Sequence, residues 1–257
     1  MAFFDCHFFS ETLALSVSAH VLLPQTPTSK GRKLHPTLFL LHGLSDDHTI
    51  WARRTSIERY AAKRNLAVIM PAVGRSFYQD TASGARYWTF LSKELPAIMR
   101  SFFPLSEKRA DNFAAGLSMG GYGALRLALA YPDKFAAGVS FSGALDYVRR
   151  LRDSGKTGSR ITKAEWNAVA GVGTDAARST SDLWHLTRRV ASRSGPKPAL
   201  WLSCGTEDDI IGDTRSFHRH LEGAGYLHHY EEGPGAHDWA FWDRQIERTI
   251  AWLPIRS

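Results

Sequence analysis

The stretch Ala115-Gly116-Leu117-Ser118-Met119-Gly120-Gly121 contains the pattern G-x-S-x-G, with Ser118 at its centre. Residues Asn112 to Ala115 before it are short and mostly apolar, which predicts the end of a buried strand. Residues Tyr122 to Tyr131 after it are rich in Ala and Leu and contain no helix breaker until Pro132, which predicts a helix. A strand, a tight turn and a helix form the context in which this pattern presents a nucleophilic serine.

The chemistry of the turn explains the pattern. Glycines two residues on either side of Ser118 let the strand and the helix approach without a Cβ clash. The turn raises the serine hydroxyl above the sheet, and the backbone N–H of Met119 lies at a helix N-terminus, where positive partial charge can stabilise an oxyanion. A Gly-rich turn can also match the pattern by chance, so the interpretation depends on finding the partners of Ser118.

Alternating strands and helices extend on both sides of this turn. Leu13, Leu15 and Val17 alternate with small or polar residues, which predicts a strand with one buried face. Continuous apolar runs predict strands buried on both faces. The expected strands are Phe3–Phe9, Leu13–Leu23, Thr37–Leu41, Leu66–Met70, the segment ending at Ala115, Phe135–Phe141, Ala199–Cys204 and Leu227–Glu231. This order predicts an α/β fold with a mostly parallel central sheet, antiparallel N-terminal strands and helices on both faces.

The segments between the strands predict helices and one insertion. Helices are expected at Trp51–Asn65, Tyr87–Phe102, Thr214–Glu222 and Trp239–Trp252, with Pro96 kinking the second of them or lying in its first turn. The run Pro24–Lys33 predicts an exposed loop. Residues 144–194 hold helical pieces interrupted by Gly155, Gly158, Gly171 and Gly173, and we expect them to cover the site as a cap-like insertion within a single domain of residues 1–257.

Composition limits the classes of function. The 257 residues suffice for one large domain, and the two cysteines, Cys6 and Cys204, are expected to be buried free thiols. No signal peptide and no apolar run of membrane-spanning length is present, which favours the cytoplasm. The net charge of +7 is scattered, which argues against nucleic-acid binding. One denser basic group is expected to be a solvated surface or a rim that attracts anionic substrates: Arg149, Arg150, Arg152, Lys156, Arg160 and Lys163.

A nucleophilic serine needs a base, and the base needs an acid that orients it. In this architecture the acid and then the histidine follow the serine in the chain. His237, in the loop after the last strand, is the expected base, because loops at the carboxyl ends of strands form such sites. The preceding strand ends at Gly205 and is followed by three carboxylates. We assign the acid to Asp208, with Asp209 as the first alternative and Glu207 as the second.

The loop after Thr37–Leu41 is the expected source of a second oxyanion donor. Gly43 lets the backbone come close, and Leu44 offers its N–H group. His42 is expected to pack and form hydrogen bonds within this loop. No residues show metal-ligand spacing and no G-x-G-x-x-G follows a strand, so the sequence predicts neither a metal nor a cofactor.

Four separate motifs resemble the esterase D group, which includes S-formylglutathione hydrolases and bacterial tributyrin esterases. They are Leu41–Leu44, Gly116–Leu125, Cys204–Asp208 and Gly233–Trp239, and the resemblance covers nearly the whole chain. Arg75–Tyr78, Tyr87–Phe90 and Glu94–Pro96 look more like the tributyrin esterase branch. The resemblance implies an α/β-hydrolase and a carboxylesterase of short acyl chains. It also implies a Ser118–His237–Asp208 triad, with Leu44 and Met119 as oxyanion donors.

The leaving group stays open at this point. A thioesterase acting on S-formylglutathione, a feruloyl or acetyl-xylan esterase and an acyltransferase all share the wider fold. Bulky side chains in Val73–Phe90 predict a pocket closed to long acyl chains, with Tyr78 and Trp88, together with Trp184 of the insertion, as substrate-binding residues. The expected partner is a small-molecule ester, and homo-oligomers are compatible with the sequence.

Overall fold

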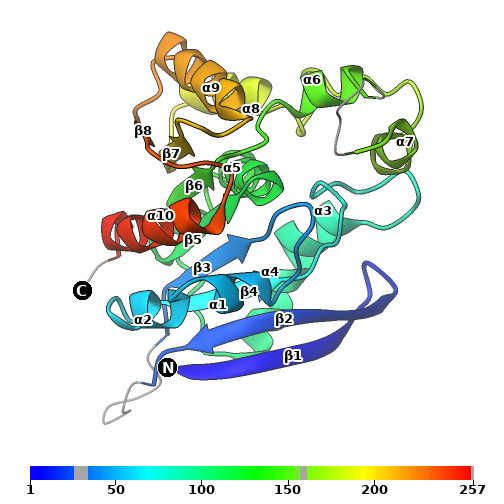
Figure 1. The fold of residues 1–257 in the computed structure, drawn as a ribbon. Helices are drawn as coiled ribbons and strands as arrows, with labels where there is room; N and C mark the ends of the chain where they lie inside the picture. Colours follow the sequence, from blue (N-terminus) through cyan, green and yellow to red (C-terminus); the bar gives the residue numbers. More distant parts are fainter. Residues whose placement is uncertain (26–33, 155, 157–160, 256–257) are drawn as a thin grey trace.

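The computed structural model describes residues 1–25, 34–154, 156 and 161–255, and Figure 1 shows their arrangement. Most of the predicted loop Pro24–Lys33, the glycines at 155 and 158, and Arg160 lie outside the described residues. Among those described, no helix combines the length and the apolar character needed to cross a membrane. Both cysteines are free, as predicted, although Cys6 is only half-buried.

One twisted sheet organises the fold, with its described strands in the order β1-β2-β4-β3-β5-β6-β7-β8. β1 pairs antiparallel with β2, and β2 antiparallel with β4, whereas the pairs from β4 through β3 to β8 are parallel. The predicted α/β-hydrolase arrangement is therefore confirmed. The strands are β1 (Ala2–Ser10), β2 (Leu15–Leu23), β3 (Thr37–Leu41), β4 (Ala67–Pro71), β5 (Asn112–Leu117), β6 (Ala137–Phe141), β7 (Ala199–Gly205) and β8 (His228–Gly233).

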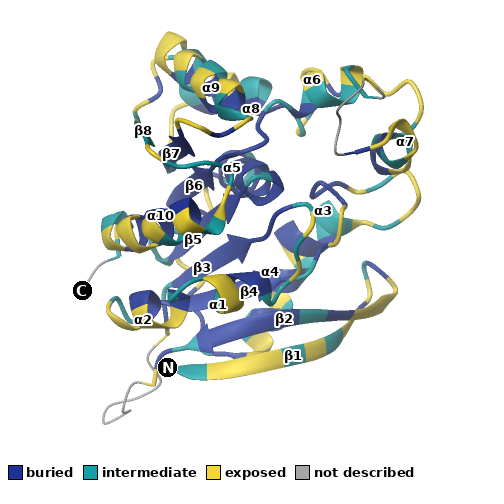
Figure 2. Cartoon of the chain, in the orientation of Figure 1, coloured by how far each residue is buried: buried dark blue, intermediate teal, exposed yellow. Residues whose placement is uncertain are grey.

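Helices cover both faces of the sheet because the central strands are apolar on both sides. In β3, Leu38 and Leu40 join one buried cluster, while Phe39 and Leu41 join the other. Figure 2 shows the central strands fully buried and β1 largely exposed at the edge. The helices are α1 (Ile50–Arg54), α2 (Ile57–Ala62), α3 (Tyr87–Thr89), α4 (Leu95–Phe102), α5 (Met119–Ala130), α6 (Tyr147–Arg152), α7 (Lys163–Ala170), α8 (Leu183–Ser192), α9 (Ile211–Gly223) and α10 (Trp239–Trp252).

Two predicted helices are interrupted. The helix expected over 51–65 divides into α1 and α2, because Thr55 is extended and the N–H of Ser56 donates to Asp243 of α10 instead of to a helical carbonyl. The helix expected over 87–102 contains a π-helical turn, η1 (Phe90–Glu94), just before α4. Pro96 lies in the first turn of α4 and has no N–H to donate, which accounts for the local change in hydrogen bonding.

The insertion at 144–194 separates into two parts. α6 and α7 project beyond the carboxyl ends of the parallel strands (Figure 1). α8 packs against α5 and α9 and is therefore part of the helical layer over the sheet. Only the first part is placed to cover a site at the strand ends.

Candidate active site

Ser118 occupies a strained turn between β5 and α5. Its φ of 52° and ψ of −118° lie in a region that residues with a side chain rarely adopt. Three backbone hydrogen bonds hold it there, since its N–H donates to the carbonyl of Phe141 at 2.9 Å and its own carbonyl accepts from Ala144 at 3.0 Å and from Tyr122 at 3.2 Å. A Cβ on Gly120 would lie 2.3 Å from the carbonyl oxygen of Leu41, so the turn requires glycine there. Such local strain is typical of functional sites.

His237 and Asp208 face each other from the loops after β8 and β7. The Nδ1 atom of His237 lies 2.9 Å and 3.1 Å from the two carboxylate oxygens of Asp208. The Asp208 side chain is fully buried, and that of His237 is 13% exposed. Since the Nδ1–H of His237 donates to Asp208, Nε2 is the nitrogen free to accept a proton, and the ring is held edge-on against Trp242.

The environment of Asp208 keeps its carboxylate ionised. Burial alone would raise its pKa, but hydrogen bonds from His237, Ser142 and the N–H of Ile210 outweigh burial and hold the pKa below its usual range. The two other candidate acids, Asp209 and Glu207, do not form this hydrogen bond with His237. Asp209 is exposed at the pocket, and Glu207 accepts the N–H of Gly235 at 2.6 Å and so fixes the loop that carries His237.

His42 orders the backbone of the loop after β3. The N–H of Val73 donates to Nε2 of His42, so the proton of the neutral ring is on Nδ1 and is donated to the carbonyl of Gly43 at 2.7 Å. That carbonyl belongs to the same peptide unit as the N–H of Leu44. Burial lowers the pKa of His42 from 6.5 to about 4, which keeps the ring neutral near pH 7.

The loop also lies beside Ser118. A Cβ on Gly43 would be 3.8 Å from the Cβ of Ser118. In the part of the chain that the structure describes, the N–H groups of Leu44 and Met119 have no hydrogen-bond acceptor. Both therefore remain available to a bound group next to the serine.

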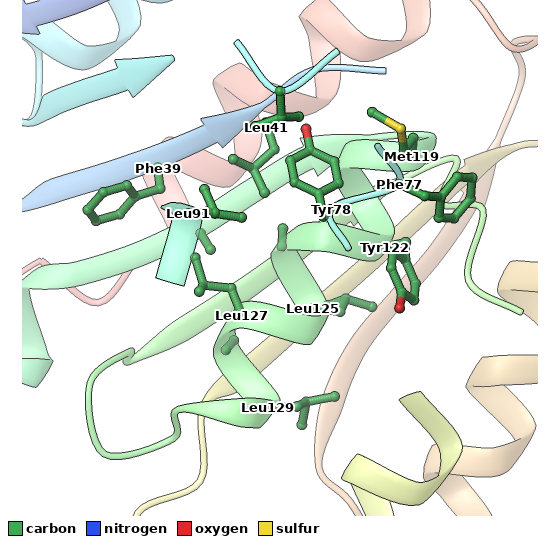
Figure 3. Close-up of a cluster of buried hydrophobic side chains, with 14 of the residues drawn as sticks. Phe39, Leu41, Phe77, Tyr78, Leu91, Met119, Tyr122, Leu125, Leu127 and Leu129 are labelled. Carbon is green, nitrogen blue, oxygen red and sulfur yellow. The ribbon is translucent and has the colours of Figure 1, made fainter. Parts of the chain in front are cut away.

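Tyr78 supports this loop from the protein interior. The hydroxyl of Tyr78 donates to the carbonyl of His42 at 2.8 Å, and Figure 3 shows its ring close to Leu41 in the buried cluster. Its ring also packs so closely on α5 that a Cβ on Gly123 would lie 2.7 Å from it. Tyr78 is fully buried and has a φ of 53°.

A pocket of about 810 Å³ opens above Ser118 and His237. Its walls come from the loop after β3, the turn at Ser118, the loop before α10 and the first part of the insertion. The apolar and aromatic lining consists of Leu44, Phe77, Leu117, Met119, Ala144, Ile161, Trp166, Ile210, Trp239 and Trp242.

Tyr78, Trp88 and Trp184 were expected to bind the substrate, but none of them lines this pocket. Tyr78 is buried under the loop after β3. Trp88 lies beneath the guanidinium of Arg126, 3.8 Å from its ring centre. Trp184 is on α8 and packs against Phe217 of α9.

Phe77 and Trp166 occupy the wall instead, with ring centres 5.1 Å apart. The loop after β4 is tied to α7 through Arg75 and Glu165, whose side chains are 2.8 Å apart, and this link brings the two rings together. Sequence reasoning missed Trp166. The available signal was a single large aromatic residue in the otherwise polar or small-residue helix α7.

The predicted basic rim is balanced by acids. Arg149 and Arg150 both bind the buried carboxylate of Asp213 on α9, and Lys156 lies 2.8 Å from Asp153. Among the described residues of the pocket lining, four are basic and four are acidic: Arg75, Arg149, Arg150 and Lys156, and Asp46, Asp153, Asp209 and Asp238. These pairs favour the solvated, structural interpretation of the basic group over attraction of anions.

Comparison with known proteins identifies the family. The model of the family named "Esterase", described as "Putative esterase", matches residues 10–253. The chain belongs to the Esterase family. This assignment confirms the predicted esterase D-type hydrolase and a carboxylic ester hydrolase as the class of enzyme.

Individual similar proteins show how far the similarity extends. The acetyl esterase of Caldicellulosiruptor saccharolyticus is 31% identical, and the match covers 98% of each chain. Two Staphylococcus aureus structures, the fluorophosphonate-binding serine hydrolase FphF with bound substrate and an S-formylglutathione hydrolase (FrmB), are each 35% identical over 98% of both chains. Their TM-scores are 0.90 and 0.88. The chain is therefore similar to these two structures over nearly its whole length.

Proposed function

We propose that this esterase hydrolyses short-chain acyl esters with Ser118 as nucleophile, His237 as general base and Asp208 as the orienting acid. The observation that carries the proposal is spatial: the strained serine and the His237–Asp208 pair face one pocket. The family assignment supports ester hydrolysis, and the acetyl esterase relative supports a small acyl group.

The proposed reaction uses each group at a defined atom. The Oγ of Ser118 attacks the ester carbonyl while Nε2 of His237 takes its proton. The N–H groups of Leu44 and Met119 donate to the oxyanion that forms. His237 then protonates the leaving alcohol, and water repeats the sequence on the acyl-enzyme. Asp208 stays ionised throughout and stabilises the imidazolium.

The pocket wall supports the limit on chain length. Each methylene that a pocket can bury contributes about 0.8 kcal/mol, whereas overfilling costs about 1–3 kcal/mol. Trp166 and Phe77 are packed against further rings and cannot move aside easily. The value of kcat/KM should therefore peak between acetyl and butyryl esters and fall at least about tenfold for octanoyl esters.

Labelling tests the nucleophile. A fluorophosphonate should modify one serine in the native enzyme, and peptide mapping by mass spectrometry should place the label on Ser118. Ser45 also lines the pocket and serves as the control, since Ser45→Ala should label like wild type and Ser118→Ala should not label. Label on Ser45, or labelling that survives Ser118→Ala, would remove Ser118 as the nucleophile.

The second candidate is hydrolysis of S-formylglutathione, favoured by the 35% identical S. aureus structure. The balanced charges of the pocket argue for the oxygen ester, because glutathione carries two carboxylates. Comparing kcat/KM for S-formylglutathione with that for p-nitrophenyl acetate separates the thioesterase from the esterase. Methyl ferulate and acetylated xylan, used as substrates in the same assay, test the feruloyl and acetyl-xylan esterase activities. Product analysis with an added acceptor alcohol tests acyl transfer.

The cytoplasmic location stays a prediction, which cell fractionation would test.

A further inference from the structure

Three histidines surround one carboxylate, and none of these four residues belongs to the pocket lining. The Oδ1 atom of Asp5 lies 3.5 Å from Nε2 of His7, 3.6 Å from Nε2 of His20 and 3.7 Å from Nε2 of His48. The ligand atoms of Asp5, His20 and His48 all lie within 4.8 Å of one another. Three ionisable side chains, Asp5, His20 and His48, therefore place their ligand atoms in one small volume, and His7 contacts the same carboxylate from outside this group.

Strand pairing creates this cluster from distant parts of the chain. Asp5 of β1 and His20 of β2 are direct partners in the antiparallel register, so their side chains share one face of the hairpin. His48 comes from the segment just before α1. The rings of His20 and His48 meet edge to face with centres 4.7 Å apart. Such residues show no ligand spacing along the sequence.

The imidazole rings of His20 and His48 lack hydrogen bonds in the part of the chain that the structure describes. Distances of 3.6 Å and 3.7 Å to Asp5 are too long for hydrogen bonds. The Nδ1 atoms of His20 and His48 are buried and have no hydrogen-bond partner within the described residues. Their Nε2 atoms face Asp5 without a hydrogen bond to it, so Nε2 is the nitrogen through which each ring could coordinate a cation while the proton stays on Nδ1.

We propose that Asp5, His20 and His48 form a Zn²⁺ site. Zinc binds imidazole nitrogen and carboxylate oxygen at about 2.0–2.2 Å, so two ligand atoms at the tetrahedral angle lie about 3.4 Å apart. The carboxylate-to-imidazole separations exceed this by only a few tenths of an ångström. Water would supply the fourth ligand, because His7 lies outside the group of mutually close ligand atoms.

The charge of the surroundings suits a cation. Imidazole coordinates zinc through an unprotonated ring nitrogen, and the carboxylate of Asp5 supplies a negative charge at the same point.

The site would join two parts of the enzyme. His48 follows Leu44 by four residues on the segment that begins at the oxyanion loop. Zinc at this place would tie that segment to the edge hairpin β1–β2. The expected consequence is a higher melting temperature with zinc. This inference does not rest on the proposed esterase mechanism, because its test measures binding alone.

Calorimetric titration of the chelator-treated full chain with Zn²⁺ tests the proposal. Wild type should bind one ion per chain. His48→Gln and Asp5→Asn should each weaken binding at least about a hundredfold, since even loss of a group that only orients a metal ligand costs about 10–100-fold. Asp5 is half exposed, so Asp5→Asn is expected to fold even where a histidine variant does not.

His228→Gln is the matched control. It removes one imidazole of the His218–His228 pair next to β8, at the opposite edge of the sheet. It should bind zinc like wild type, and Co²⁺ in place of zinc should give the intense visible absorption of a tetrahedral site in wild type and His228→Gln only. No saturable binding by wild type, or unchanged binding in both Asp5→Asn and His48→Gln, would overturn the assignment.

Discussion

Acidification from pH 7 to pH 4 should destabilise the fold through His42. In the folded chain this imidazole accepts the N–H of Val73 at Nε2 and donates Nδ1–H to Gly43. Protonation of Nε2 would remove the acceptor for Val73 and place a charge in a fully buried position. Folding therefore favours the neutral ring, which lowers the pKa of His42 below its value in the unfolded chain.

The size of the effect follows from the two pKa values. The pKa is 6.5 for the unperturbed group and about 4 in the fold, a difference of 6.5 − 4 = 2.5 units. At 1.36 kcal/mol per unit, the free energy of unfolding should fall by about 3 kcal/mol on this account. Because the folded pKa is depressed, this stability is fully present above pH 6.5 and is lost as the pH falls to about 4.

Urea unfolding of wild type and His42→Gln at several pH values between 7 and 4 isolates the contribution. Glutamine keeps one donor and one acceptor but does not titrate. Groups shared by both proteins, such as His20, cancel in the difference between them. The stability advantage of wild type over His42→Gln should shrink by about 3 kcal/mol between pH 7 and pH 4.

Parallel stability profiles for the two proteins would refute this reasoning. They would mean that His42 protonates in the fold as readily as it does in the unfolded chain. The rate of p-nitrophenyl acetate hydrolysis at pH 7 gives a second readout, since an unordered Gly43–Leu44 peptide should lower kcat more than it changes KM.

Further outcomes follow from the proposed site. Ser118→Ala should lower kcat by about 10⁶-fold with unchanged thermal melting, because the catalytic groups act as a unit; a rate within tenfold of wild type would contradict this. Asp208→Asn should cost about 10⁴-fold in kcat by favouring the wrong tautomer of the histidine, and Asp209→Asn far less; steady-state kinetics showing the reverse order would move the acid by one residue. Trp166→Ala should raise the octanoyl-to-butyryl ratio of kcat/KM at least about tenfold, whereas Trp184→Ala, which alters the insertion away from the pocket, should leave that ratio unchanged.

The sequence predicted the parts of the site that depend on local backbone constraints. G-x-S-x-G around Ser118 requires a strand, a turn and a helix in direct succession, and the structure has all three. The acid and base candidates follow strands of the same parallel sheet, so their loops had to meet at one edge. Among the three adjacent carboxylates, Asp208 accepts the hydrogen bond from Nδ1 of His237, although the exposed carboxylate of Asp209 also lies within 4.8 Å of this pair.

The pocket wall could not be predicted in the same way. Phe77 and Tyr78 are adjacent aromatic residues that both have positive φ, and only the three-dimensional path of the loop decides which one faces the pocket. Trp166 reaches the wall through the fold of the insertion and through contacts between the loop after β4 and α7, which are distant in sequence. The histidine cluster at Asp5 likewise depends on the register of a hairpin.

Arg126 has a consequence for redesign of this enzyme. Its buried guanidinium donates to the carbonyls of Tyr78 and Thr180 and to the side chain of Gln79, and it stacks on Trp88. One side chain thus sets the spacing between the loop after β4, the insertion and α5. Mutant libraries that aim at a wider acyl pocket would therefore do better to vary the wall residues than the layer behind them. Replacing Arg126 would leave several buried carbonyls without donors and would scramble the geometry that each wall substitution is meant to tune.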